Sequence, residues 1–146
     1  MNKFVLHQKL ASDCIELGTM QNSLLLLMNN SLVPWFILVP KTMKRELYEL
    51  TDTEQTEIYA HINLLSEFIT RHFNVNKINM ASIGNVVNQI HIHVIGRHYD
   101  DYCWPDVVWG KTERQEYKEE EIKKIVQQLH IGLKGFMAGK MSENLN

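Results

Sequence analysis

A glutamine and two histidines occupy every second position in one segment of the chain. Gln89, His91 and His93 are each followed by an aliphatic residue. Side chains two residues apart point to the same face of a β-strand, so residues 89–97 are predicted to form a strand with one apolar face. Its other face carries two imidazoles, roughly 6 to 7 Å apart, and an amide. Two such imidazoles could divide the work of attacking and stabilising one phosphate or one water molecule.

Phosphoryl transfer is the chemistry that uses both histidines. A neutral imidazole, here His91, can attack phosphorus and form a phosphoramidate that water later cleaves. His93, on the same face, can bond the phosphate oxygens as the bond breaks. The second ring nitrogen of His91 must then donate to an acceptor, often a backbone carbonyl, so that the attacking nitrogen is unprotonated. Gln89 can add an amide donor or acceptor, although it cannot titrate.

A zinc site is the rival interpretation, because His-x-His on a strand is a common pair of zinc ligands. Zinc takes three or four ligands, however, and His98 is the nearest further candidate in the sequence. Asp100 and Asp101 follow a Gly-Arg bend. We therefore expect no metal and no cofactor. A third possibility is that the histidines decorate a solvent-facing strand without any chemical role.

The composition is that of one ordinary globular domain. The chain has 146 residues, 45% hydrophobic and 22% charged, with a formal net charge of −2. This balance argues against a protein that coats nucleic-acid polymers. The longest apolar run, residues 24–28, is too short to span a membrane, and no secretory signal is recognisable, so a cytoplasmic location is expected. Cys14 and Cys103 form no CxxC pair and are expected to be buried or idle thiols.

Hydrophobic periodicity places the remaining elements. Strands are predicted over residues 14–18, 23–28, 35–39 and 77–83, the last joined to the histidine strand by a short hairpin loop. A capping box at Thr51 opens a long amphipathic helix, and a second helix is predicted from Lys118 to about Met137. Because strands and helices do not alternate, the fold class is α+β, with an antiparallel sheet of about five strands and two main helices on one face.

Two features outside these elements allow more than one interpretation. Residues 4–13 form either a short helix or an extended lead-in. The aromatic segment 98–110 is either a lid that stacks on a base or structural cover for the sheet, and composition favours cover. His61 and His72, on the long helix, are expected to be solvated or hydrogen-bonded rather than ligands.

The segment 84–97 resembles the signature of the histidine triad (HIT) nucleotide hydrolases and transferases. That signature is a Gly-Gln turn followed by three histidines that alternate with aliphatic residues. The matching residues here are Gly84, Val87, His91, His93, Val94, Ile95 and Arg97. Residues 24–30 and 35–41 also resemble the nucleotide-side strands and Pro-Lys turn of the family. The resemblance extends from about residue 14 to residue 97 and implies a single HIT-like domain over 1–146.

Three positions depart from the family pattern. Gln89 replaces the first triad histidine, Asn85 replaces the glutamine of the turn, and Trp35 replaces an upstream histidine. In the family, the two replaced histidines belong to the supporting hydrogen-bond network. Their joint replacement is expected if Gln89 and Trp35 touch across neighbouring strands, since a polar partner left buried alone costs about 1–3 kcal/mol. Because His91 and His93 remain, the chemistry is expected to be retained with an altered rate or leaving-group preference.

The resemblance also implies ligands and partners. Asn29 is expected to meet the ribose, Asn85 the phosphate, and Trp35 with its neighbouring strands the base, with Asn79 as a further substrate-binding candidate. The implied activity is hydrolysis at the α-phosphate of a dinucleoside polyphosphate such as diadenosine tetraphosphate, or of a nucleoside phosphoramidate or adenylyl conjugate. The alternatives are a nucleotide-binding protein with little turnover and, third, a zinc-dependent enzyme. A homodimer that joins two sheets is expected, without membrane or nucleic-acid polymer as partner.

Overall fold

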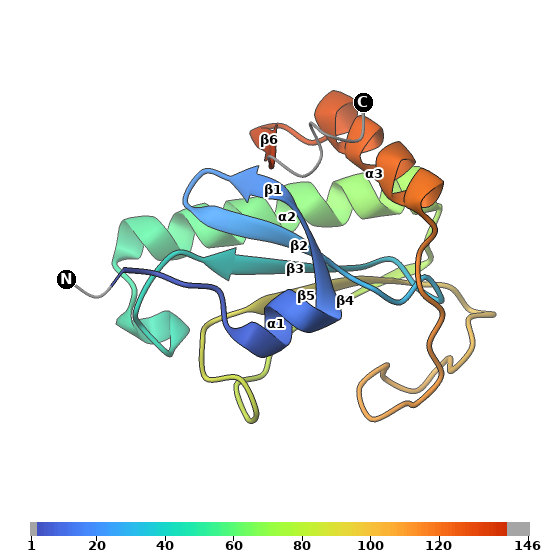
Figure 1. The fold of residues 1–146 in the computed structure, drawn as a ribbon, viewed down its shortest axis with the longest axis horizontal. Coiled ribbons are helices and arrows are strands. Elements are labelled where there is room, and N and C mark those ends of the chain that lie inside the picture. Colours follow the sequence, from blue (N-terminus) through green and yellow to red (C-terminus); the bar gives the residue numbers. More distant parts are fainter. Residues whose placement is uncertain (1–2, 140–146) are drawn as a thin grey trace.

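The computed structural model describes residues 3–139 and contains one six-stranded antiparallel sheet (Figure 1). The strand order is β4-β5-β3-β2-β1-β6. The strands are β1 (Cys14–Met20), β2 (Ser23–Met28), β3 (Trp35–Pro40), β4 (Lys77–Ser82), β5 (Ile92–Arg97) and β6 (Phe136–Ala138). The helices are α1 (Gln8–Asp13), the short 3-10 turn η1 (Leu47–Glu49), α2 (Asp52–Phe73) and α3 (Glu119–Gly132). The α+β class, the antiparallel sheet and the two main helices are confirmed.

The sheet has one strand more than the sequence predicts. The predicted second helix ends at Gly132 instead of continuing to about Met137, and residues 136–138 pair with β1 as β6. Gly135 turns the chain with φ +84°, a conformation that glycine adopts without steric cost. Phe136 is buried in β6, and it also fits the apolar spacing of the predicted helix. Helical periodicity therefore could not distinguish a longer helix from a turn and a strand.

Helices α2 and α3 cover one face of the sheet. Thr51 caps α2 and exchanges hydrogen bonds with Glu54, as the capping box predicts. Apolar residues of both helices pack on alternate residues of the central strands in one hydrophobic cluster. Among them are Leu65 and Phe68 of α2 and Leu129 of α3. No helix among residues 3–139 is long and apolar enough to cross a membrane.

The opposite face of the sheet is covered by short elements and loops. A second hydrophobic cluster joins strand residues such as Ile37 and Ile95 to Leu10 of α1, Val87 and Val108. The last two residues belong to irregular segments that connect the secondary-structure elements. His93 pairs with Ile37 of β3 and Ala81 of β4, so its side chain belongs to this loop-covered face. Loops and the short helix α1, rather than α2 and α3, therefore shape the surroundings of the histidines.

The histidine strand begins later than predicted. β5 begins at Ile92, whereas Gln89 and His91 lie in the connection 83–91 after β4. The β4–β5 hairpin is confirmed, but its loop is longer than expected. The Gln89 side chain accepts a hydrogen bond from the backbone N–H of His7 and donates one to the carbonyl of Val5, both at 2.9 Å. The Gln89 amide thus binds the N-terminal segment, whereas the sequence pattern placed it on the same strand face as the histidines.

A buried ion pair fixes the end of β5. The Arg97 guanidinium donates to both carboxylate oxygens of Asp101, at 2.7 and 2.9 Å, and to Asn79 Oδ1 at 3.0 Å. The side chains of Arg97 and Asp101 are 1% and 2% exposed. Burial raises the pKa of Asp101, but hydrogen bonds from Arg97 and from backbone N–H groups outweigh this effect and lower the pKa. The pair anchors the start of segment 98–110 to the sheet.

We expect Asp101→Asn to lower the free energy of unfolding by about 3–5 kcal/mol, because Arg97 would remain buried without an opposite charge. Urea unfolding measures this change. Glu67→Gln is the matched control, because its ion pair with Arg71 is exposed and contributes at most about 1 kcal/mol. Equal losses in the two variants would contradict the assignment.

Candidate functional site

His91 and His93 lie next to each other on the loop-covered face. Their ring centroids are 5.0 Å apart and the ring planes are inclined at 69°. Each residue is 6% exposed. No partner among the described residues hydrogen-bonds to the Nε2 atom of either ring. The two imidazoles are therefore close enough to act on one group.

The partner of His91 determines which of its nitrogens is free. His91 Nδ1 lies 2.7 Å from the backbone carbonyl oxygen of Gln89. A carbonyl oxygen can only accept, so Nδ1 must carry the hydrogen. In the neutral ring, Nε2 then has the unshared electron pair. The sequence predicted a carbonyl partner for the His91 ring, and this hydrogen bond confirms that partner.

The partner of His93 imposes the opposite arrangement. The indole N–H of Trp35 donates to His93 Nδ1 at 2.9 Å. An indole nitrogen can only donate, so Nδ1 must be unprotonated and the ring hydrogen lies on Nε2. Burial, and then the neighbouring His91, lower the pKa of His93 to about 4. At neutral pH His93 is therefore an uncharged ring whose Nε2 is a hydrogen-bond donor.

A cavity of about 320 Å³ opens beside His93. Its walls include aromatic, amide and cationic side chains: Asn30, Trp35, Tyr102, Trp109 and Arg114. Trp109 packs edge-on against Trp35 and His93, with centroids 6.0 and 5.4 Å away. Arg114 is held in place because its guanidinium donates to the carbonyls of Asn29 and Asp13. The cavity therefore has flat apolar walls and polar groups, as a nucleoside requires.

Gln89 and Trp35 do not hydrogen-bond to each other, so the expected contact between these replacements is wrong. Gln89 binds the N-terminal segment through its side chain and His91 through its backbone. Trp35 instead binds His93. Gln89 therefore supports His91 and the N-terminal segment, whereas Trp35 supports His93. The indole reaches His93 because β3 and β5 are neighbouring strands.

The predicted substrate-binding asparagines do not line the His93 cavity. Asn29 Oδ1 accepts from the backbone N–H of Tyr117, and its carbonyl holds Arg114. Asn79 Oδ1 accepts from Arg97. Asn85 is exposed in the connection 83–91. The structure thus brings Trp35 and His93 together at the cavity but places these three side chains elsewhere.

Several cavity residues were not among the predicted site residues. Asn30 lies one position from the predicted Asn29, and Arg114 lies in a segment without recognisable periodicity. Segment 98–110 covers the sheet, as composition favoured, since Val108 is in the core; Trp109 also lines the cavity. The aromatic content of this segment was the one available signal in the sequence.

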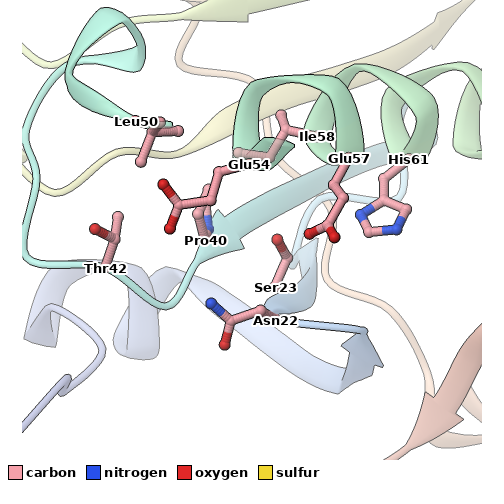
Figure 2. Close-up of a pocket in the computed structure, with 9 residues that line it drawn as sticks. All are labelled: Asn22, Ser23, Pro40, Thr42, Leu50, Glu54, Glu57, Ile58 and His61. Atoms are coloured by element: carbon pink, nitrogen blue, oxygen red, sulfur yellow. The ribbon is translucent and has the colours of Figure 1, made fainter. Parts of the chain in front are cut away.

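A second, smaller pocket lies between α2 and the ends of β2 and β3. Figure 2 shows the Glu57 carboxylate, the Ser23 hydroxyl and the His61 ring gathered around it. Its volume of about 20 Å³ suits one water molecule but no nucleotide. His61 lines this pocket, and its Nδ1 is buried without a partner among the described residues, so the expected hydrogen bond is not found at that atom. The expectation for His72 is confirmed, since its Nδ1 bonds the carbonyl of Phe68.

The described residues contain no group of three or more His, Cys, Asp or Glu side chains arranged to hold a metal. Both cysteines are free and half-buried. Burial raises the pKa of Cys14 to about 12. Cys103 Sγ accepts a hydrogen bond from Arg97. The raised pKa of Cys14 argues against this thiol as a nucleophile.

Known proteins share this fold and this segment. Residues 10–100, more than half of the chain, match the family described as HIT domain. The chain therefore belongs to the HIT domain family. A histidine triad protein of known structure from Marinobacter aquaeolei VT8 is 37% identical, with a TM-score of 0.87. The match covers 93% of this chain and 100% of that protein.

More distant relatives have named activities. A bis(5'-adenosyl)-triphosphatase from Dictyostelium discoideum is 28% identical over 89 residues, and a bis(5'-nucleosyl)-tetraphosphatase [asymmetrical] from Schizosaccharomyces pombe is 25% identical over 85. These alignments cover 57% and 55% of this chain. They span 60% and 47% of the relatives' own lengths. Both relatives are thus named as dinucleoside polyphosphate hydrolases.

The low pKa of His93 predicts a pH-dependent stability. Between about pH 4 and 6.5 the unfolded chain binds the extra proton and the folded protein does not, so stability rises with pH in this window. For this group alone, the free energy of unfolding at pH 5 should be about 2 kcal/mol below that at pH 7. Urea unfolding at both pH values measures the slope. His93→Gln should have a smaller slope, and an unchanged slope would contradict the assignment.

Proposed function

We propose that the protein is a nucleotide hydrolase that cleaves at the α-phosphate of a dinucleoside polyphosphate or adenylyl conjugate through a nucleotidyl-His91 intermediate. In this proposal it is a HIT variant in which Gln89 occupies the position of the first triad histidine. The complementary tautomers of His91 and His93 are the observation that carries the proposal. One ring offers a free electron pair and its neighbour offers a hydrogen.

The first step is attack by His91 Nε2 on the α-phosphorus. A bond forms between nitrogen and phosphorus, and the bond from phosphorus to the bridging oxygen breaks. The bridging oxygen takes the electron pair and leaves with the rest of the substrate. The Nδ1 hydrogen of His91 stays on the ring and remains hydrogen-bonded to the Gln89 carbonyl. This hydrogen bond stabilises the positive charge that the ring acquires. His93 Nε2–H donates to a phosphate oxygen as negative charge accumulates there.

The second step returns the enzyme to its starting state. Water attacks the same phosphorus, the nitrogen–phosphorus bond breaks, and Nε2 recovers its electron pair. The water proton is released to solvent or to the departing product. The sum is one substrate plus one water giving a nucleoside monophosphate and the remainder of the substrate. Both histidines end in the tautomers in which they began.

We place the nucleoside of the monophosphate half in the His93 cavity. Trp35 and Trp109 offer flat apolar surfaces for the base. The Asn30 amide oxygen accepts from the backbone N–H groups of Leu32 and Gln115 and one of its N–H groups donates to the Glu113 carbonyl, so its second N–H remains for the sugar. Asn29 contributes by holding Arg114 through its carbonyl. Asn85 is proposed to approach the phosphates from the exposed connection 83–91.

We also propose a homodimer that forms through β4. This strand is at one edge of the sheet, and Met80 within it is 56% exposed. An edge strand can pair with its equivalent in a second copy and so continue the sheet.

His91→Ala should reduce hydrolysis of diadenosine tetraphosphate to the background rate, because the attacking nitrogen is lost. Nucleotide release measured by chromatography gives the rate, and AMP binding by calorimetry should be retained. Indistinguishable rates for the variant and the parent would remove His91 as nucleophile. A parent protein that binds AMP without turnover would support the alternative, a nucleotide-binding protein.

Trp35→Phe should lower kcat for the same substrate about fivefold to tenfold, because the donor that fixes the His93 tautomer is lost. Trp35→His retains an N–H donor and should recover part of this loss. If the phenylalanine and histidine variants are equally impaired, the indole acts by packing and not through its hydrogen bond.

A further inference from the structure

A positively charged cavity lies beside Gln89. Its volume is about 240 Å³, and its cationic wall consists of Lys3, Lys44 and Arg45. Asn88 and Gln89 form part of the remaining wall. Among residues 3–139, no aspartate or glutamate lines it. The cavity is therefore suited to an anion, and the catalytic steps proposed above do not use it.

The position of this cavity relative to His91 suggests what it holds. Gln89 lines the basic cavity and His93 lines the His93 cavity. His91 is midway between these two residues in the sequence. The His91 ring contacts both neighbours, since it bonds the Gln89 carbonyl and lies 5.0 Å from the His93 ring. Four residues span at most roughly 13 Å. From His91 to Gln89 is half of that span, which a chain of several phosphates attached at His91 is long enough to cover.

We propose that the cavity lined by Lys3, Lys44 and Arg45 binds the distal phosphates of the leaving group, so that the substrate class is the dinucleoside polyphosphates. The inference rests on the proposed function and deepens it. Phosphoramidates and adenylyl conjugates with an uncharged leaving group gain nothing from this cavity.

Charge supports this assignment. A departing nucleoside triphosphate carries several negative charges, whereas the chain has a formal net charge of −2 and offers no general attraction for anions. Local cations must therefore provide the attraction. Glu49 is an opposing charge close to Lys44 and Arg45, but its carboxylate accepts from the backbone N–H groups of Arg45 and Glu46 and does not line the cavity.

The leaving-group chemistry agrees with the charge. A departing amine needs a proton, whereas a departing polyphosphate oxygen is stable as an anion near neutral pH. His93 is uncharged at that pH, because burial and His91 lower its pKa to about 4. It can donate a hydrogen bond but has no additional proton to give. The histidine pair therefore favours a leaving group that departs as an anion.

The double variant Lys44→Gln/Arg45→Gln tests the inference. With diadenosine tetraphosphate, kcat/KM should fall about tenfold, and the loss should shrink at high salt because exposed charges are screened. With adenosine 5'-phosphoramidate, kcat/KM should stay within about twofold of the parent. The matched control, Lys124→Gln/Lys134→Gln, removes two exposed lysines from the α3 end of the chain and should change neither value.

Equal effects on the two substrates, no effect on either, or the same effect in the control would overturn the inference. A binding measurement separates this failure from failure of the proposed function. On His91→Ala protein, calorimetry should show tighter binding of diadenosine tetraphosphate than of AMP, and the double variant should abolish the difference. Equal affinities on His91→Ala protein would refute the basic cavity as a polyphosphate site even if the parent shows no turnover.

Discussion

Two hydrogen bonds, one to each histidine ring, determine what this site can do, because one partner can only accept and the other can only donate. The Gln89 carbonyl can only accept and the Trp35 indole can only donate, so the two histidines must hold their hydrogens on opposite nitrogens. In their neutral forms, the His91 ring then offers an unshared electron pair at Nε2 and the His93 ring offers an N–H. Nothing in the imidazoles themselves distinguishes these roles, since both rings are equally buried. The distinction comes from the groups that touch them.

The fold places these two partners by different means. Trp35 and His93 lie on the neighbouring strands β3 and β5, so the sheet fixes their separation. Gln89 lies in the irregular connection before β5, and its side chain is bound to the carbonyl of Val5 and the N–H of His7. The N-terminal segment thus holds Gln89 in place, and the Gln89 carbonyl in turn orients the His91 ring. The short helix α1 and loops cover this face, while α2 and α3 cover the other, as Figure 1 shows.

Much of this arrangement could be predicted from local sequence. Alternation identified the strands, the capping box at Thr51 identified the start of α2, and the two histidines were identified by their spacing. The end of α3 was missed, because Phe136 satisfies a helical and a strand pattern equally well. Hydrogen bonds between distant residues were also missed. The Trp35–His93 bond joins residues 58 positions apart, and periodicity carries no information about such pairs. Asn30 and Arg114 belong to the same class, because only the folded chain shows that they share a cavity.

The ring nitrogens of the two histidines provide the most direct test of this account. In ¹⁵N-labelled protein at pH 7, NMR chemical shifts distinguish a protonated from an unprotonated imidazole nitrogen. The account predicts hydrogen on Nδ1 of His91 and on Nε2 of His93. The same tautomer in both rings, or a positively charged His93, would contradict it.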